Sequence, residues 1–93
     1  MASGRVPEWE MVAGAVRAEL ARRNIVRRDA VAALMEGSAQ QDGGGLGRTA
    51  SYERIAGLVP FSWSELEILS LSFEIPLEIL SGSRAPDVAA VRV

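Results

Sequence analysis

The stretch YERIAGLVPFSWSELEILSLSFEIPLEILSG, residues 52–82, decides the fold because it contains the boundaries of three successive helices. Gly57 lies near the end of the first, and Pro60 stops that helix because proline lacks the backbone amide hydrogen. SWSE at residues 62–65 has the form of a capping box, a serine followed three residues later by a glutamate, and an apolar run comes after it. Pro76 opens a last short helix before the closing glycine. The stretch therefore predicts three short helices in a row.

The residues before this stretch predict two more helices and a loop. An opening proline and apolar residues at helical spacing indicate a helix over residues 7–23, which Asn24 ends. Asp29 is expected to cap a second helix, which Gly37 ends. Residues 38–47, rich in glycine and glutamine, are expected to form a loop. No segment has the pattern of a strand, so the predicted fold class is all-α: a bundle of five helices with an elongated loop between the second and the third.

The chain has 93 residues, enough for one small domain. We assign residues 1–82 to that domain and residues 83–93 to a flexible tail or the start of a linker. No signal peptide or membrane span is expected, and cysteine is absent, so we expect a cytoplasmic location. All ten basic residues are arginine, which together with abundant alanine, valine and glycine indicates a GC-rich coding genome, such as that of an actinobacterium or its phage.

The charges are unevenly distributed along the chain. The net charge of −2 argues by itself against a nucleic-acid partner, because DNA-binding domains are usually basic. Residues 17–54, however, hold seven arginines against five acids, whereas residues 55–82 hold four acids and no basic residue. One face of the molecule could therefore meet phosphate while another is acidic.

Catalysis is not expected from this sequence. Histidine and cysteine are both absent, so the chain lacks the usual general base near neutral pH and the commonest metal ligands. DGGGLGRT at residues 42–49 departs from a phosphate-binding loop at two positions: Asp42 replaces the first glycine and Arg48 replaces the lysine. No strand is predicted before it. We therefore expect no enzyme activity, no metal or cofactor site and no small-molecule substrate.

The order and size of the predicted helices resemble those of the lambda-repressor/Cro-like, or XRE-type, helix-turn-helix family. The likeness is greatest in the back half, where an Arg-Ile pair at residues 54–55 precedes a glycine and a proline, and IPLEIL at residues 75–80 occupies the place of the family's closing helix. VAGAVRAELARRNI at residues 12–25 resembles the family's first helix, and RRDAVAALMEG at residues 27–37 its second. The arginine-rich, lysine-free composition of the chain also resembles that of immunity repressors of phages that infect actinobacteria.

The resemblance implies a sequence-specific regulator of transcription that binds a double-stranded DNA operator, a repressor of the phage immunity or Cro-like kind. Two features depart from the family pattern. The family's second helix usually begins Ser-Gln, where this chain has Arg27 and Arg28. About ten residues separate Gly37 from Arg48, where the family has a turn of three or four.

The third helix would then enter the DNA groove. Its guanidinium, hydroxyl and phenol groups can contact base edges, and the expected base-reading residues are Arg48, Thr49, Ser51, Tyr52 and Arg54. The structural alternative is a polar helix facing solvent, with Thr49 or Ser51 as its cap and Arg54 paired to a nearby glutamate.

An arginine cluster surrounds the junction of the first two helices. Arg23, Arg27 and Arg28 are the expected DNA phosphate contacts, which position a protein without specifying sequence. The structural alternative is a solvated turn with favourable helix-dipole interactions.

The last two helices are apolar and acidic, and in the resembling family this region often forms the contact of a homodimer. The expected dimer or partner surface consists of Trp63, Leu71, Glu74 and Leu77. Trp9, Trp63 and Phe73 are also candidates for the core, which for Trp63 leaves both positions open. The alternative function is a protein-interaction module, such as an antitoxin-like regulator, that binds its partner through this surface.

Overall fold

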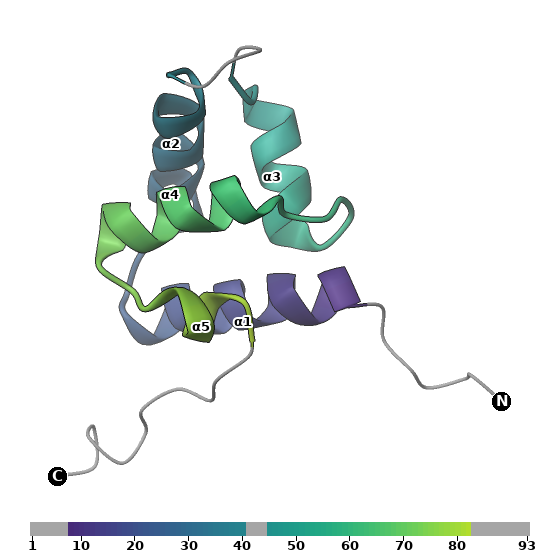
Figure 1. The fold of residues 1–93 in the computed structure, drawn as a ribbon, viewed down its shortest axis with the longest axis vertical. Helices are drawn as coiled ribbons and strands as arrows, with labels where there is room; N and C mark the ends of the chain where they lie inside the picture. Colours follow the sequence, from purple (N-terminus) through teal and green to yellow (C-terminus); the bar gives the residue numbers. More distant parts are fainter. Residues whose placement is uncertain (1–7, 41–44, 83–93) are drawn as a thin grey trace, which may run out of the picture.

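The computed structural model describes residues 8–40 and 45–82, and all regular secondary structure in these two ranges is helical. The helices are α1 (Glu8–Arg22), α2 (Arg27–Ser38), α3 (Arg48–Ala56), α4 (Trp63–Phe73) and α5 (Leu77–Leu80) (Figure 1). The predicted all-α class with five helices is confirmed, and nine residues, 39–47, separate the end of α2 from the start of α3 in the sequence. The predicted tail at residues 83–93 lies outside the described residues.

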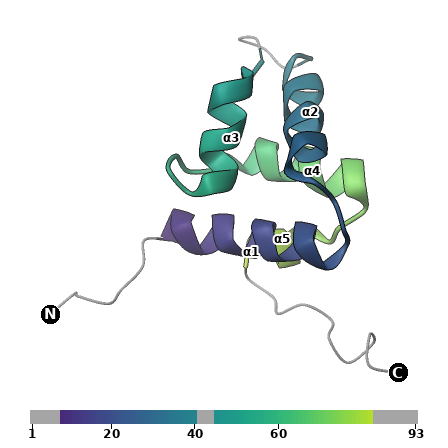
Figure 2. The ribbon, with the colours of Figure 1, turned by 180° about the vertical axis from the view of Figure 1, so that it is seen from behind.

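The five helices surround one core. α2 and α3 lie side by side (Figure 1). The C-terminal end of α2 and the N-terminal end of α3 lie at the same end of this pair, so the two helices run in opposite directions. α4 packs on α2 and crosses it, as the view from behind also shows (Figure 2). α1 and α5 pack against each other, while α1 also contacts α3 and α5 also contacts α4.

Every helix contributes side chains to this core. Its members are Val16, Leu20, Ala30, Val31, Leu34, Ile55, Leu66, Leu69, Ile75, Ile79 and Leu80. Leu34, Ile55 and Leu69 have no exposed surface, so α2, α3 and α4 are held by the same cluster. α3 therefore has an inner face that is fixed to the core.

Two tryptophans that were candidates for the core lie at the surface. Trp9 is 43% exposed and Trp63 is 58% exposed, whereas Phe73 is half-buried against the core. Burial begins at Ala13 on α1 and at Glu65 on α4. Both tryptophans thus lie in a first turn that precedes the packed part of the helix. The core prediction for Trp9 is therefore wrong, and Trp63, for which the core and the surface were both open, lies at the surface.

The predicted end of α1 at Asn24 is confirmed. Asn24 has φ 59°, in the left-handed region, and its amide donates to the Ala21 carbonyl at 3.2 Å. The next amide, of Ile25, donates to the Leu20 carbonyl at 2.8 Å. These bonds satisfy carbonyls that the helix leaves without an internal donor.

The predicted N-caps of α2 and α3 are wrong. α2 begins at Arg27 with Val26 as its N-cap, so Asp29 lies within the first turn, where the helix dipole favours its charge. α3 has Gly47 as its N-cap, so Thr49 and Ser51 lie inside the helix. Neither cap residue offers a side-chain acceptor, so neither helix has a side-chain cap.

The predicted capping box of α4 is confirmed. The Glu65 amide donates to Ser62 Oγ at 3.1 Å, and the Ser62 amide donates to Glu65 Oε1 at 2.8 Å. α5 follows Pro76 directly, and Gly82 after it has φ 80°, a left-handed conformation that suits glycine.

Gly37 is the point at which α2 approaches α4, and not the end of α2, which continues to Ser38. A Cβ atom at Gly37 would lie 2.6 Å from Cγ2 and 3.0 Å from Cγ1 of Ile68. We expect Gly37→Ala to lower the free energy of unfolding by about 1–2 kcal/mol, because overpacking of about 2–3 kcal/mol exceeds the helix-propensity gain of about 1 kcal/mol.

Urea denaturation followed by circular dichroism measures this change, and Gly14→Ala is the matched control. At Gly14, inside α1, the nearest atom to an added Cβ is 3.9 Å away on Arg17. Alanine there should raise the free energy of unfolding by about 0.5–1 kcal/mol. An equal gain at both glycines would contradict the close approach of α2 and α4.

Glu74 ends α4 with φ 56°, a left-handed conformation that favours glycine. The strain energy that glycine would relieve at this φ is larger than the extra entropic cost of fixing glycine on folding. Glu74→Gly should therefore raise the free energy of unfolding by about 0.5 kcal/mol. Asn24→Gly is the comparison, and it should change stability less because asparagine tolerates positive φ better. Thermal denaturation of the two variants measures both effects, and a larger gain at Asn24 would contradict the argument.

Candidate nucleic-acid interface

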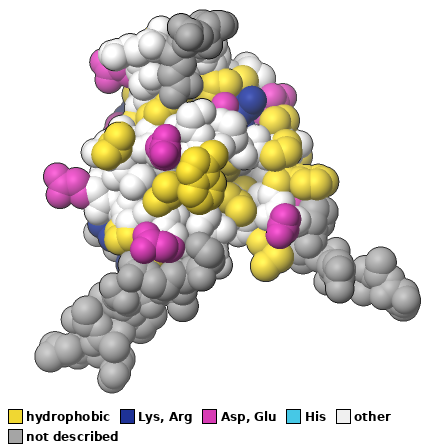
Figure 3. Space-filling view, in the orientation of Figure 1, with side chains coloured by type: hydrophobic (Ala, Val, Ile, Leu, Met, Phe, Trp, Pro, Cys, Tyr) yellow, Lys and Arg dark blue, Asp and Glu magenta, His cyan; other side chains and the backbone are white. Residues whose placement is uncertain are grey.

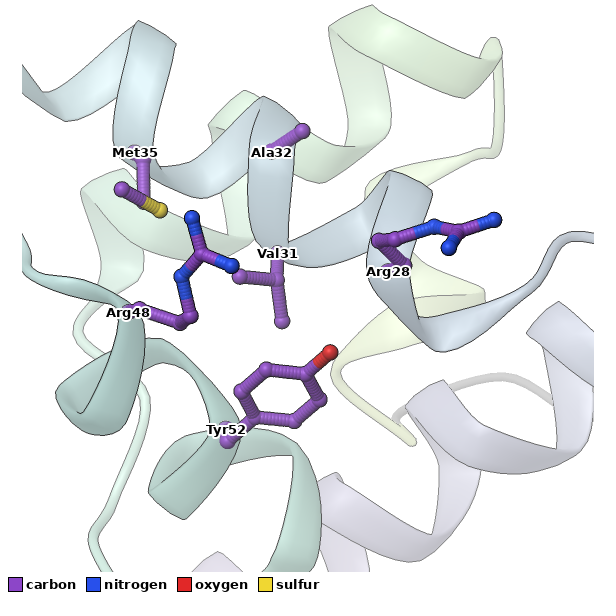
Figure 4. Close-up of a pocket in the computed structure, with 6 residues that line it drawn as sticks. All are labelled: Arg28, Val31, Ala32, Met35, Arg48 and Tyr52. Carbon is purple, nitrogen blue, oxygen red and sulfur yellow. The ribbon is translucent and has the colours of Figure 1, made fainter.

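A groove of about 160 Å³ lies between α2 and α3. It is lined by Arg28, Val31, Ala32 and Met35 of α2 and by Arg48 and Tyr52 of α3. Arg48 and Tyr52 reach from α3 toward α2, and Arg28 and Arg48 lie on either side of Val31 (Figure 4). The groove thus has apolar side chains in its middle and an arginine on each side, and the Arg28 side chain extends away from Val31 (Figure 4).

The arginines of the described residues fall into two classes. Arg27, Arg28 and Arg48 are exposed and form no ion pair or side-chain hydrogen bond within the described part of the chain. The other four described arginines all have internal partners. The three unpaired charges belong to the start of α2 and the start of α3, where an anionic partner could reach them.

Two further predicted base-reading residues are exposed on α3. Thr49 is exposed next to Arg48. Tyr52 follows Arg48 by four residues, so the side chains of Arg48 and Tyr52 lie on one face of the helix. Tyr52 is 38% exposed because part of its ring lines the groove. Arg48, Thr49 and Tyr52 therefore form a polar surface that is accessible from outside.

Ser51 does not belong to this surface. It has no exposed area, and its Oγ donates a hydrogen bond to the Gly47 carbonyl at 2.9 Å. Ser51 follows Gly47 by four residues, so this bond lies within the first turn of α3 and faces the core. A buried hydroxyl cannot reach a base edge, which corrects the expectation for Ser51.

Arg54 is used inside the protein. Its Nε donates to Glu65 Oε1 at 3.0 Å, and its Nη1 donates to the Ala50 carbonyl at 2.9 Å. Less than a fifth of either side chain of this ion pair is exposed. Arg54 therefore joins α3 to the start of α4, which is the structural alternative for this residue and removes it from the base-reading set.

Arg23 is likewise neutralised by an internal acid. Its Nε donates to Glu19 Oε2 at 2.8 Å, and Arg22 pairs with the same carboxylate, whose side chain is buried. Arg17 also turns inward and donates from Nη1 to the Ile55 carbonyl at 2.6 Å, at the end of α3. Arg23 is thus paired within the chain but remains exposed, so its phosphate contact stays a prediction, while Arg27 and Arg28 have no ion-pair partner among the described residues.

The expected partner surface is partly assembled. Trp63, Leu71 and Glu74 are all exposed, at the two ends of α4 and directly after it. Leu77 instead packs against the core and is only partly exposed. Leu77 therefore contributes to the fold, and this corrects its place in the surface.

Sequence reasoning missed three residues of the groove: Val31, Ala32 and Met35. Val31 and Met35 carry the apolar spacing of α2, which indicates a core face and says nothing of a groove beside it. Their role depends on where α3 lies, and no pattern within α2 could reveal that.

Comparison of the chain with protein-family models, with curated proteins and with solved structures finds no match. Among the described helices, none is both long and apolar enough to cross a membrane. The described residues also contain no group of three acidic, histidine or cysteine side chains that could hold a metal ion.

Proposed function

We propose that this protein is a sequence-specific double-stranded DNA-binding regulator of transcription that acts as a repressor, of the phage immunity or Cro-like kind. The observation that carries the proposal is the segregation of the arginines. Among the described residues, the exposed guanidiniums without internal partners belong to the first turns of α2 and α3, and Arg28 and Arg48 line one groove. Unpaired arginines on one surface are what a phosphate-rich partner requires.

In this proposal α3 enters the major groove with its exposed first turns. Arg48 can donate two hydrogen bonds to a guanine, and Thr49 can donate to a base or to a phosphate. Tyr52, held beside Val31 and Met35, can place its ring against a sugar or a thymine methyl group. Ser51 and Ile55 on the inner side of α3 hold the helix to the core.

The start of α2 is proposed to hold a DNA phosphate. Arg27 and Arg28 occupy the first two positions of α2, where positive side chains are unfavourable next to the positive end of the helix dipole. The first amides of the helix also lack a side-chain acceptor, because Val26 is the N-cap. A phosphate at this position would offset the repulsion and accept hydrogen bonds from those amides.

The acidic residues support the same orientation. Between residues 55 and 82 the chain has four acids and no base, and this segment includes α4 and α5. Such a segment would be repelled by phosphate, so it would face away from the duplex. The separation also explains how a protein with a net charge of −2 could bind DNA.

Repression then follows from occupancy, because a protein bound at an operator excludes RNA polymerase from an overlapping promoter. In this proposal the protein acts in the cytoplasm of a bacterial host. The experiment is a selection from random DNA duplexes at low salt, followed by gel shifts of the enriched duplex against random duplex over a range of salt concentrations. An enriched motif bound more tightly than random duplex is expected, and equal binding of all duplexes would refute sequence-specific recognition.

A further inference from the structure

The outward face of α4 carries large apolar side chains that the core does not use. Trp63, Glu67 and Leu71 recur every four residues on α4, so they lie along one side of the helix, and Glu74 follows directly after it. We call these four residues the α4 ridge. Leu71 is 82% exposed and Trp63 is more than half exposed. An aromatic and an aliphatic side chain therefore stand two helical turns apart in solvent.

The surroundings of the α4 ridge are acidic. Hydrophobic side chains gather over α4 and α5, with acidic side chains among them and few basic ones in view (Figure 3). Glu65, on the inner side of α4, is neutralised by Arg54. Glu67 and Glu74 have no ion-pair partner among the described residues, and Glu78 of α5 is exposed nearby in the chain.

We propose that the α4 ridge docks a basic amphipathic helix of a partner protein. Such a helix would place two apolar side chains, also two turns apart, against Trp63 and Leu71. Its lysine or arginine side chains would meet Glu67 and Glu74 between and beside these anchors. The combination of exposed aromatic and aliphatic anchors with unpaired carboxylates specifies this chemistry, because apolar contacts supply attraction and opposite charges supply orientation and selectivity.

The α4 ridge of a second copy of the chain would not complement the α4 ridge of the first. A two-fold contact through the α4 ridge brings the same patch of both copies together, so Glu67 and Glu74 of each copy would meet carboxylates of the other. No basic residue between positions 55 and 82 is available to compensate them. Like charges at an interface are costly, and the ridge therefore favours a partner of opposite charge.

The ridge and the arginine groove can be occupied together. The groove opens between α2 and α3, and α4 lies behind α2 when the groove faces the viewer (Figure 4). A helix on the α4 ridge would thus leave Arg28 and Arg48 accessible. The proposal does not depend on DNA binding, and it fits a regulator that contacts DNA with one face and a protein with another.

The test is an NMR titration of the full chain, labelled with nitrogen-15, with a synthetic peptide of about 18 residues, long enough to form a helix. The peptide carries leucines every fourth residue on one face and lysines beside them, and a second peptide has glutamate in place of each lysine. The basic peptide is expected to shift the amide signals of α4 and the indole signal of Trp63, which Trp63→Phe assigns. The acidic peptide should shift neither.

Two variants locate the site. Leu71→Ser and Glu67→Arg should each weaken binding of the basic peptide by about tenfold or more. The first removes an apolar anchor, and the second replaces a carboxylate that would pair with a lysine of the peptide. Both positions are exposed, so circular dichroism should show unchanged melting, and Arg48→Ala should bind the peptide as the parent chain does. Equal binding of both peptides, or shifts outside α4, would overturn the proposal. So would self-association in sedimentation that Leu71→Ser abolishes, since the ridge would then be a dimer contact.

Discussion

Alanine at both Arg28 and Arg48 is expected to lower the affinity for the selected DNA duplex by about 100-fold or more, without lowering the melting temperature. An arginine that contacts a base contributes about 1–3 kcal/mol, and a hydrogen bond to a charged phosphate contributes about 1.5–3 kcal/mol. The two contacts are made by different helices. Neither side chain has an ion-pair or hydrogen-bond partner among the described residues, so its loss removes no polar contact that holds the fold. Fluorescence anisotropy with a labelled duplex measures the affinity, and circular dichroism measures the melting.

The two single variants should differ in kind. Arg28→Ala removes a proposed phosphate contact, so it should weaken the enriched and the random duplex alike and reduce the slope of log K against log salt by about 1. Arg48→Ala removes a proposed base contact, so it should weaken the enriched duplex more than the random one. This difference distinguishes positioning of the protein on DNA from reading of the sequence.

Arg22→Ala is the matched control for net charge. This variant removes the positive charge of Arg22, and the partner of Arg22, Glu19, keeps its ion pair with Arg23. Its DNA affinity should stay within about threefold of the parent chain, since a charge outside the interface acts only through screened long-range attraction. An equal loss in Arg22→Ala and in the groove variants would show that total charge, and not the groove, governs binding.

The helices were predictable because their ends carry local signals. Pro60, the capping box at Ser62 and the left-handed stop at Asn24 each act through residues only a few positions away. The starts of α2 and α3 were mispredicted for the opposite reason. Val26 and Gly47 have no capping side chain, so neither start carries the hydrogen-bonding signal of a serine, threonine, aspartate or asparagine cap.

The candidate site was predictable only in part, because seven described arginines of identical chemistry serve different purposes. The pairing of Arg23 with Glu19 was accessible, since a glutamate and an arginine four residues apart on a helix can meet. The bond from Arg17 to the Ile55 carbonyl was not, because it joins residues far apart in the sequence. Arg27, Arg28 and Arg48 became distinguishable only after the paired arginines had been identified in the fold.

Arg54→Ala is expected to lower the free energy of unfolding by about 2 kcal/mol and to leave DNA affinity nearly unchanged in the folded protein. Removing one member of a buried ion pair costs about 3–5 kcal/mol, and the cost is smaller here because both side chains keep some contact with water. The loss has a specific cause. Glu65 Oε1 accepts from both Arg54 and the Ser62 amide, so the pair connects α3 to the N-terminus of α4.

A double-mutant cycle with Glu65→Gln tests this origin. Glutamine keeps an oxygen that can accept from the Ser62 amide but loses the charge that Arg54 requires. Urea denaturation of Arg54→Ala, Glu65→Gln and the double variant should give a coupling energy of about 1–2 kcal/mol, since the second substitution costs little once the first is made. Additive losses would mean that Arg54 acts independently of Glu65. If Arg54→Ala then lost DNA affinity while remaining fully folded, Arg54 would return to the base-reading face, and the division between paired and unpaired arginines would have to be redrawn.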